Sequence, residues 1–231
     1  MENERRKKYT DLEVVKVGYA NGVSHNFPLS DKDKQKMIKK AATAYGKFLD
    51  ALDCDWQNDP NSMETPTRVA KAYVNDLWAG RYTAMSNITS FPSDGYDGIV
   101  IERNIPLTSM CSHHHQTISG VVHIGYIAGE EGQVIGLSKL NRIVELFGRR
   151  GAIQEQLTSA IHGAVDKITE GNLGVAVTIV AGHNCVSCRG VKHQGASMVT
   201  TKASGAFRDN TNNARKEFFD SLKINNGGHQ I

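Results

Sequence analysis

Residues 99–127, IVIERNIPLTSMCSHHHQTISGVVHIGYI, decide the fold of this chain. Isoleucine and valine gather between Ile99 and Ile105, and apolar residues alternate in places along Thr117–Ile127. Both patterns predict β-strands, joined by a short connection. Because that connection carries Cys111 and three consecutive histidines, the sequence places metal-binding side chains at the end of a predicted strand.

Helical periodicity lies on both sides of these two strands. Apolar residues at helical spacing predict a helix after Ser30, and Thr65-Pro66 has the composition of an N-cap followed by a first helical residue. The order of helices, two strands, two helices, two strands and a helix indicates a mixed α/β chain. The later elements are a helix from Ser138, helices at 153–168 and 215–222, and strands at 175–180 and 197–201.

Composition divides the chain into three parts. Residues 1–30 are polar, with scattered apolar residues, and we expect a flexible N-terminal segment there. Residues 31–95 form a helical region, and the stretch 82–97, which spans its boundary with the next part, is rich in turn residues. Residues 96–231 hold the strands and the candidate site, so we expect them to form the catalytic domain, with a loose tail at NNGGHQI.

Size and charge exclude several classes of protein. With 231 residues, 39% of them hydrophobic, the chain can bury one sizeable core. No run approaches the ~18 apolar residues that span a membrane, and the N-terminal MENERRKK lacks the apolar core of a secretory signal. We therefore expect a cytoplasmic protein with no membrane partner. The formal net charge of +3 does not favour nucleic acid.

Two groups of cysteine and histidine point to a metal ion. Cys111 and His114 have C-x2-H spacing, which lets one short turn present both side chains to an ion. His183, Cys185 and Cys188 form a second group at the end of another predicted strand. Strand ends that lie in one sheet can meet, so both groups can serve one site. The alternative is that these side chains are structural or belong to a solvated loop.

A metal site of this composition can be closed or open. A closed site would combine the cysteines of both groups with His114 and would be structural. An open site would have three protein ligands and a position for a water molecule that zinc activates. The surplus histidines, His113 and His183, favour the open site, since hydrolysis needs proton carriers nearby. Periodicity alone leaves both alternatives open.

Basic residues near predicted helix starts suit a phosphorylated substrate. Lys139 and Arg142 share a face close to Ser138, and helix starts favour anions. Arg68 and Lys71 repeat this spacing, and Arg189 directly follows the second cysteine group. The alternative for any such pair is an ordinary solvated helix face.

A carboxylate could recognise guanine. Gln154-Glu155 opens the long helix, and a carboxylate can accept two hydrogens from the N1–H and 2-amino edge of that base. Adenine lacks this pair of donors. Taken alone, Gln-Glu at this place is typical of an ordinary helix surface.

Together these motifs resemble the GTP cyclohydrolase I family in order and spacing. The resemblance covers roughly residues 31–222 and is far more specific than any single motif. The matching stretches are METPTRVA (63–70), CSHH (111–114), IGLSKLNR (135–142), Gln154-Glu155 and HNCVSCRG (183–190).

The resemblance implies an α+β tunnelling fold, in which antiparallel strands of neighbouring subunits form a barrel with helices outside. It implies a homodecamer of two stacked pentamers with sites between subunits, so Arg68 and Lys71 act at a neighbour's site. It also implies that GTP and water yield formate and 7,8-dihydroneopterin triphosphate.

The resemblance also assigns the site residues. It implies that Zn2+ is held by Cys111, His114 and Cys185, with Cys188 left out. The implied catalytic residues are His113, His183 and Ser138, and Gln154 and Glu155 hold the guanine. The residues implied to neutralise the triphosphate are Lys139, Arg142, Arg189, Arg68 and Lys71.

Three residues depart from the family's pattern, and two rival classes remain. Ser112 stands where the family often has an acidic residue, His115 where a bulky apolar residue is common, and Cys188 is unusual beside the site. These departures concern the tuning of the metal site. The rivals are a nitrile reductase of the same fold, which uses a catalytic cysteine and NADPH, and a non-enzymatic module with a closed zinc site.

Overall fold

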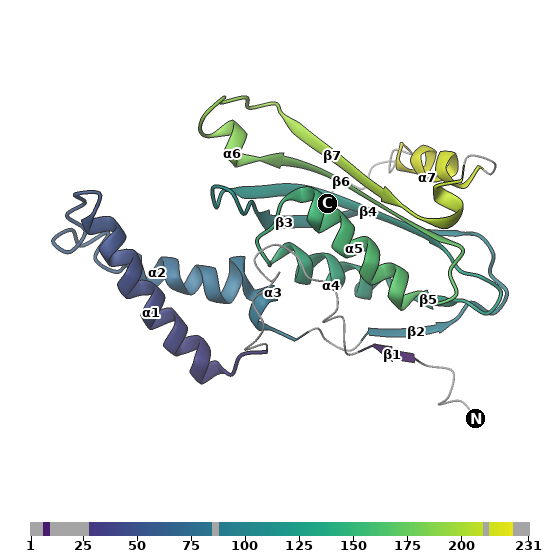
Figure 1. Cartoon of the computed structure of the whole chain (residues 1–231), viewed down its shortest axis with the longest axis horizontal. Helices are drawn as coiled ribbons and strands as arrows, with labels where there is room; N and C mark the ends of the chain where they lie inside the picture. The colour runs from purple at the N-terminus through teal and green to yellow at the C-terminus, as the bar shows by residue number, and fades with distance from the viewer. Residues whose placement is uncertain (1–6, 10–27, 85–87, 210–212, 224–231) are drawn as a thin grey trace.

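A four-stranded antiparallel sheet in the order β3-β4-β6-β7 forms the centre of the molecule. Its strands are β3 (Ile99–Met110), β4 (Thr117–Ile127), β6 (Gly174–His183) and β7 (Ser197–Ala203). All four were predicted from the β-rich runs of the sequence, although β3 and β6 extend further than the apolar pattern indicated. The sheet brings strands that are distant in sequence side by side (Figure 1).

The computed structural model describes residues 7–9, 28–84, 88–209 and 213–223. The flexible segment predicted for residues 1–30 lies largely outside these ranges, as does the tail predicted after residue 223. Within the segment, Lys7–Tyr9 forms the short strand β1. The antiparallel sheets and packed helices establish an α+β architecture.

Two helices cover one face of the central sheet, as Figure 1 shows. They are α4 (Leu137–Gly148) and α5 (Gln154–Ile168), and both carry an apolar stripe at helical spacing. Phe147 of α4 and Leu157 and Ile161 of α5 are fully buried in the main core. Helix α4 begins one residue before the predicted Ser138, because Gly136 is the extended residue ahead of it.

The opposite face of the sheet is partly covered by α7 (Ala214–Leu222). Phe218 of this helix packs edge-on against Phe207 and joins a second apolar cluster with Ile127 and Ala176. Arg103 of β3 donates a hydrogen bond of 2.7 Å to the Ser221 carbonyl oxygen. The helix is therefore held by apolar packing and by a contact with the sheet edge.

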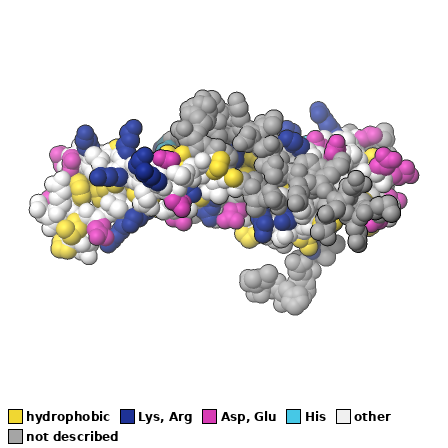
Figure 2. Space-filling model, turned by 90° about the horizontal axis from the view of Figure 1, so that it is seen from below, with side chains coloured by type: hydrophobic (Ala, Val, Ile, Leu, Met, Phe, Trp, Pro, Cys, Tyr) yellow, Lys and Arg dark blue, Asp and Glu magenta, His cyan; other side chains and the backbone are white. Residues whose placement is uncertain are grey.

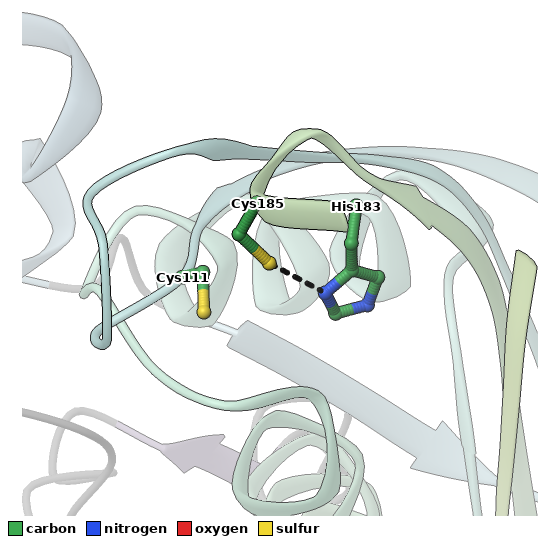
Figure 3. Close-up of side chains that lie close together, drawn as sticks. All are labelled: Cys111, His183 and Cys185. Atoms are coloured by element: carbon green, nitrogen blue, oxygen red, sulfur yellow. Dashed lines mark hydrogen bonds between the residues drawn. The ribbon is translucent and has the colours of Figure 1, made fainter. Parts of the chain in front are cut away.

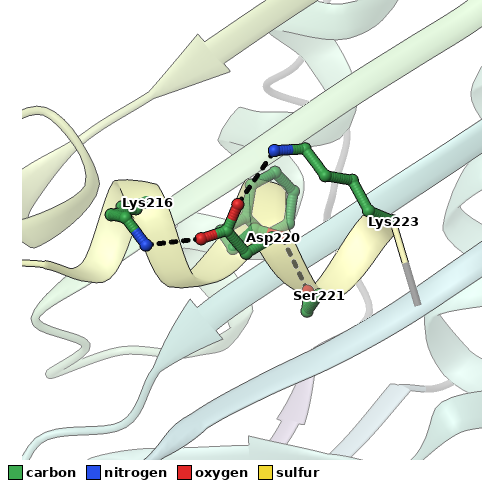
Figure 4. Close-up of polar contacts among 5 residues, drawn as sticks. Lys216, Asp220, Ser221 and Lys223 are labelled. Carbon is green, nitrogen blue, oxygen red and sulfur yellow. Dashed lines mark hydrogen bonds and ion pairs between the residues drawn. The ribbon is translucent and has the colours of Figure 1, made fainter.

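Charged side chains on the exposed side of α7 form ion pairs near its C-terminal end. The Asp220 carboxylate accepts from Lys216 at 2.7 Å and from Lys223 at 2.9 Å (Figure 4). These two lysines lower the pKa of Asp220 to about 2. Because the pairs are solvent-exposed, they contribute little to stability, and the burial of Phe218 matters more.

A second, three-stranded sheet in the order β1-β2-β5 was not predicted. Its middle strand is β2 (Ile88–Pro92), which pairs antiparallel with β5 (Gln133–Ile135) on one side and with β1 on the other. The turn-rich assignment of residues 82–97 was therefore wrong for β2. Strands of three to five residues give too short an alternation to be recognised in a sequence.

The N-terminal helical region comprises four helical elements, which are α1 (Asp31–Asp50), α2 (Thr65–Ala72), the π-helix η3 (Tyr73–Leu77) and α3 (Ala79–Tyr82). Ile38, Ala70 and Val74 form its small core. The Ser30 side chain accepts from the Asp33 backbone N–H, as expected of an N-cap. Thr65 is not the N-cap of α2, because the helix includes it and Glu64 precedes it.

Helix α3 of this region lies at a close approach to α4. A Cβ atom on Gly80 would lie 2.0 Å from the Leu146 carbonyl oxygen of α4, so only glycine fits there. The buried guanidinium of Arg150 donates to the Gly80 carbonyl oxygen at 2.9 Å and stacks over Phe147. Burial lowers the pKa of Arg150 to about 10.

The visible surface carries charges of both signs. Figure 2 shows Lys and Arg side chains interspersed with Asp and Glu at the helical end of the molecule. This mixture agrees with the small net charge of +3. Among the described residues, no helix is both long enough and apolar enough to cross a membrane.

Candidate metal and substrate site

Strand register brings the two cysteine-histidine groups together. On β4, Ile118 lies opposite Ser109 of β3 on one side and His183 of β6 on the other. Directly opposed residues project to the same face, so His183 shares the helix-covered face with Ile118. Cys111 follows β3 directly and is 3% exposed. The prediction that the strand ends meet at one site is confirmed.

The side chains of Cys111, His183 and Cys185 converge at this end of the sheet (Figure 3). The ligand atoms that they offer all lie within 4.8 Å of one another. The Cys185 sulfur lies 4.0 Å from Nδ1 of His183. Cys185 is carried by α6 (Asn184–Ser187), a single helical turn that directly follows β6.

This group is suited to a divalent cation. Burial raises the pKa of the Cys185 thiol, and the neighbouring Cys111 sulfur raises it further. The Cys185 thiol therefore resists ionisation unless a positive charge lies beside it. Thiolates and imidazole are the ligands that zinc prefers, so the donor set fits such an ion.

The connection after Cys111 places the neighbouring histidines at the surface. His113 and His114 are exposed, with ring centroids 6.3 Å apart, and His114 lies outside the group of converging ligand atoms. The structure thus joins His183, and not His114, to Cys111 and Cys185. The zinc-ligand role of His114 stays a prediction.

Cys188 also lies outside the converging group. It is exposed, and its sulfur lies 2.6 Å from the Asn184 carbonyl oxygen and 3.4 Å from Oε1 of Gln116. This arrangement agrees with the open site favoured above, since the closed alternative needs Cys188 among the ligands.

Gln154, at the first position of α5, is completely buried. Its Nε2 donates to the carbonyl oxygens of Ile179, at 3.2 Å, and Met198, at 3.1 Å. Its Oε1 lies 2.7 Å from Nε2 of His183. Gln154 therefore connects α5 to β6, β7 and the site, and the ordinary surface alternative is wrong for this residue.

Charged residues stand close to the converging side chains. Glu155 is exposed beside Gln154, and its charge opposes the lowering of the His183 pKa that burial causes. Arg189 is exposed after α6, and its charge opposes the raised pKa of Cys185. Glu155 and Arg189 therefore bring one negative and one positive charge close to the converging side chains.

The other predicted substrate residues lie on two helices. Ser138 and Arg142 are exposed and Lys139 is half-buried, all in the first turns of α4. On α2, Arg68 forms an exposed ion pair of 3.1 Å with Glu64, and Lys71 is exposed. Their substrate contacts stay predictions.

One contact of the metal-site connection was missed by sequence reasoning. His115 has a left-handed backbone with φ of 53°, and its Nδ1 lies 3.3 Å from the Tyr73 hydroxyl of η3. Its ring also forms a T-shaped contact with the Trp78 ring, with the ring centroids 5.3 Å apart. These partners are distant in sequence, so no local pattern could reveal them. The contact ties the site to the N-terminal helical region.

The fold and the site together define an α+β protein with a thiol–imidazole group that could hold a metal ion. Comparison with protein families narrows this class. The family model of GTP cyclohydrolase I matches residues 41–223, which include every element from α2 to α7. The chain belongs to the GTP cyclohydrolase I family.

Several bacterial proteins named GTP cyclohydrolase 1 are similar to the chain. The protein of Aeromonas hydrophila is 36% identical over 88% of this chain and 92% of its own length. That of Corynebacterium glutamicum is 40% identical over 80% and 93%, and that of Aeromonas salmonicida 41% over 84% and 87%.

A solved structure offers a much weaker likeness. A dihydroneopterin aldolase from Burkholderia thailendensis, bound to guanine, covers 48% of this chain and 92% of its own. Its sequence identity is 12% and its TM-score 0.35, so the tunnelling fold stays a prediction.

Proposed function

We propose that the chain catalyses the zinc-dependent opening of the imidazole ring of GTP, releasing formate and forming 7,8-dihydroneopterin triphosphate. One observation carries the proposal. Cys111, His183 and Cys185 converge at the end of the central sheet, inside the segment that matches the GTP cyclohydrolase I family. Family membership supports the reaction, and the donor set supports zinc.

The zinc ligands in this proposal are Cys111, Cys185 and His114. His114 follows Cys111 by three residues on a short turn, so both side chains belong to one connection. When bound, the ion supplies Lewis-acid chemistry that makes a water molecule nucleophilic near neutral pH. The convergence of both thiols supports the sulfur ligands.

The proton carriers in this proposal are His113 and His183, which serve the purine nitrogens and the ribose oxygen. Burial lowers the pKa of His183, so the ring is neutral near pH 7 and can accept a proton. His113 is exposed, within reach of a substrate at the surface. The Ser138 hydroxyl assists the later rearrangement at the ribose.

Glu155 holds the guanine edge, and basic side chains neutralise the triphosphate. Its carboxylate accepts two hydrogens from the base, and it stands close enough to His183 to influence that pKa. The basic side chains are exposed, except for the half-buried Lys139, so phosphate oxygens of a substrate at the surface can approach them. They are Lys139, Arg142 and Arg189, together with Arg68 and Lys71 acting at a neighbour's site.

Assembly through the central sheet completes the proposal. In the described part of the chain, β3 and β7 are the two edges of that sheet, and Val199 on β7 is 60% exposed. Uncovered edges invite pairing with another chain. We propose that the edges of neighbouring subunits join into the barrel of the tunnelling fold, in a decamer of two pentamers.

Incubation of the zinc-loaded protein with GTP tests the reaction. We expect formate and, after oxidation, a fluorescent pterin in equal amounts. We also expect about one zinc ion per chain by elemental analysis. GTP left intact by the zinc-loaded protein would contradict the proposal. Oxidation of NADPH by a zinc-free protein would favour the nitrile reductase.

A further inference from the structure

The buried amide of Gln154 has a fixed orientation. Its Nε2 faces the carbonyl oxygens of Ile179 and Met198, which can only accept hydrogen bonds. If the amide oxygen and nitrogen were exchanged, Oε1 would face these two carbonyl oxygens. All three atoms are acceptors, and no hydrogen would lie between them. A further contact of 3.0 Å joins Nε2 to the Thr200 hydroxyl. The nitrogen therefore faces β6 and β7, and Oε1 faces His183.

This orientation decides which ring nitrogen of His183 carries the hydrogen. Oε1 of Gln154 is an acceptor, and it lies 2.7 Å from Nε2 of His183. Nε2 must therefore donate, because two acceptors at this distance would repel. In a neutral imidazole the other nitrogen is then unprotonated. That nitrogen, Nδ1, lies on the side of the Cys185 sulfur, as Figure 3 shows.

We propose that Gln154 is a positioning residue that holds His183 in its Nε2–H tautomer, with the Nδ1 lone pair directed toward Cys111 and Cys185. Gln154 then acts through His183 and does not hold the guanine. Its amide hydrogens and oxygen are already engaged, and the side chain is completely buried.

Two threonines reinforce the position of Gln154. The Thr158 hydroxyl donates to the Gln154 carbonyl oxygen at 2.8 Å and lies 2.6 Å from the Thr200 hydroxyl. Thr158 is one helical turn after Gln154 on α5, and Thr200 belongs to β7. These buried hydrogen bonds hold the start of α5, and with it the side-chain amide of Gln154, against the sheet.

An Nδ1 lone pair has a direct chemical use. Acceptance of a proton from a substrate requires an unprotonated ring nitrogen facing the site. This use rests on the proposed function, because it assigns proton transfer to His183. The tautomer itself follows from the hydrogen bonds and does not depend on any reaction.

Magic-angle-spinning NMR of the metal-free protein with 15N-labelled histidine tests the tautomer. The spectrum of a His183→Gln variant identifies the His183 signals by their loss. In the wild-type protein we expect Nε2 to be protonated and Nδ1 to be unprotonated. A hydrogen on Nδ1 with Nε2 unprotonated would overturn the proposal, whether or not the protein hydrolyses GTP.

Gln154→Met, which keeps the length of the side chain and removes its polar atoms, tests the positioning role. We expect this variant to lose the single-tautomer signal of His183. Turnover of GTP should fall about 10–100-fold while the KM changes little. Gln156→Met is the matched control, since Gln156 is exposed on the same helix.

Two outcomes would separate this inference from the proposed function. A raised KM with an unchanged His183 signal would make Gln154 a substrate residue and overturn the inference. The expected NMR result in a protein that releases no formate would leave the tautomer standing and contradict only the proposed function.

Discussion

His114 and His183 have different tasks in the proposed site. His114→Ala should reduce zinc to well below one ion per chain, because it removes a ligand. His183→Ala should keep the zinc and lose most of its GTP turnover, because it removes a proton carrier. Elemental analysis and a formate assay of both purified variants measure the difference. The reverse pattern would make His183 the third ligand, as its convergence with the two cysteines would allow.

Glu155 is exposed, so its substitution can be interpreted through the substrate. In Glu155→Gln, an amide NH2 group replaces one of the two carboxylate oxygens that accept hydrogens from the guanine edge. A lost hydrogen bond to a charged group costs about 1.5–3 kcal/mol, which corresponds to roughly 10–100-fold in kcat/KM for GTP. Steady-state kinetics with GTP and with ITP, which lacks the 2-amino group, provide the measurement.

The loss should be smaller with ITP, since fewer hydrogens face the carboxylate. Glu145→Gln, on the exposed side of α4, serves as the control and should behave like the wild-type protein. Equal losses with GTP and ITP would remove Glu155 from recognition of the 2-amino group.

Residue types and spacing predicted which cysteines meet, but not every partner. Cys111 and Cys185 converge because each follows a strand of one sheet, and both strands were visible in the sequence. The burial of Gln154 was not predictable, since glutamine at a helix start is ordinarily exposed. Its partners come from other strands, and only the packed fold brings them to the amide.

At the scale of elements, the contact between α3 and α4 leaves no room for a side chain at Gly80. Gly80→Ala should lower the free energy of unfolding by about 1–3 kcal/mol, because its Cβ would meet the Leu146 and Arg149 carbonyl oxygens. Gly163→Ala is a matched control on α5. Its Cβ meets no atom within 4 Å, and it should stabilise that helix by about 0.5–1 kcal/mol.

Chemical denaturation of the two variants beside the wild-type protein checks both signs. If Gly80→Ala and the wild-type protein were equally stable, α3 and α4 would be able to move apart without a cost in free energy. The N-terminal helical region would then be less firmly held than the Arg150 contact indicates.

The buried His162 of α5, beside the end of β7, should make stability depend on pH. Burial lowers the pKa of His162, the charge of Lys202 lowers it further, and its Nε2 lies 3.1 Å from the Ser204 hydroxyl. The unfolded state then binds protons more readily than the folded state. The free energy of unfolding should therefore fall as the pH drops below about 6.5, the ordinary value for histidine.

Denaturation curves between neutral pH and about pH 5 measure this dependence. His162→Gln should weaken the pH dependence of the free energy of unfolding only in part, since burial also lowers the pKa of His123. Stability that rises on acidification would contradict the assignment.

Length explains which elements were predictable. The strands of the central sheet and the helices that cover it contain 7–15 residues each, enough for a period to be recognised. The strands β1, β2 and β5 have 3–5 residues and gain their order from one another. Their pairing depends on segments far apart in the chain, which no local pattern records.

At the scale of the whole molecule, the edges of the central sheet predict an assembly. Light scattering of the purified protein should give a mass of about ten times the 25.3 kDa of one chain. Val199→Lys would place a charge on the exposed side chain of β7 and should shift the assembly toward smaller species. A monomer that retains full turnover would contradict sites shared between subunits.

The small sheet has a mechanical implication for the start of the chain. Lys7–Tyr9 pairs with β2, β2 pairs with β5, and β5 ends at Ile135, two positions before α4 begins. Through these successive pairings, three residues near the N-terminus help to hold the start of the helix that carries Ser138 and Lys139. Exchanging Lys7–Tyr9 for a purification tag would remove the pairing with β2 and loosen the start of α4 without changing any side chain on that helix.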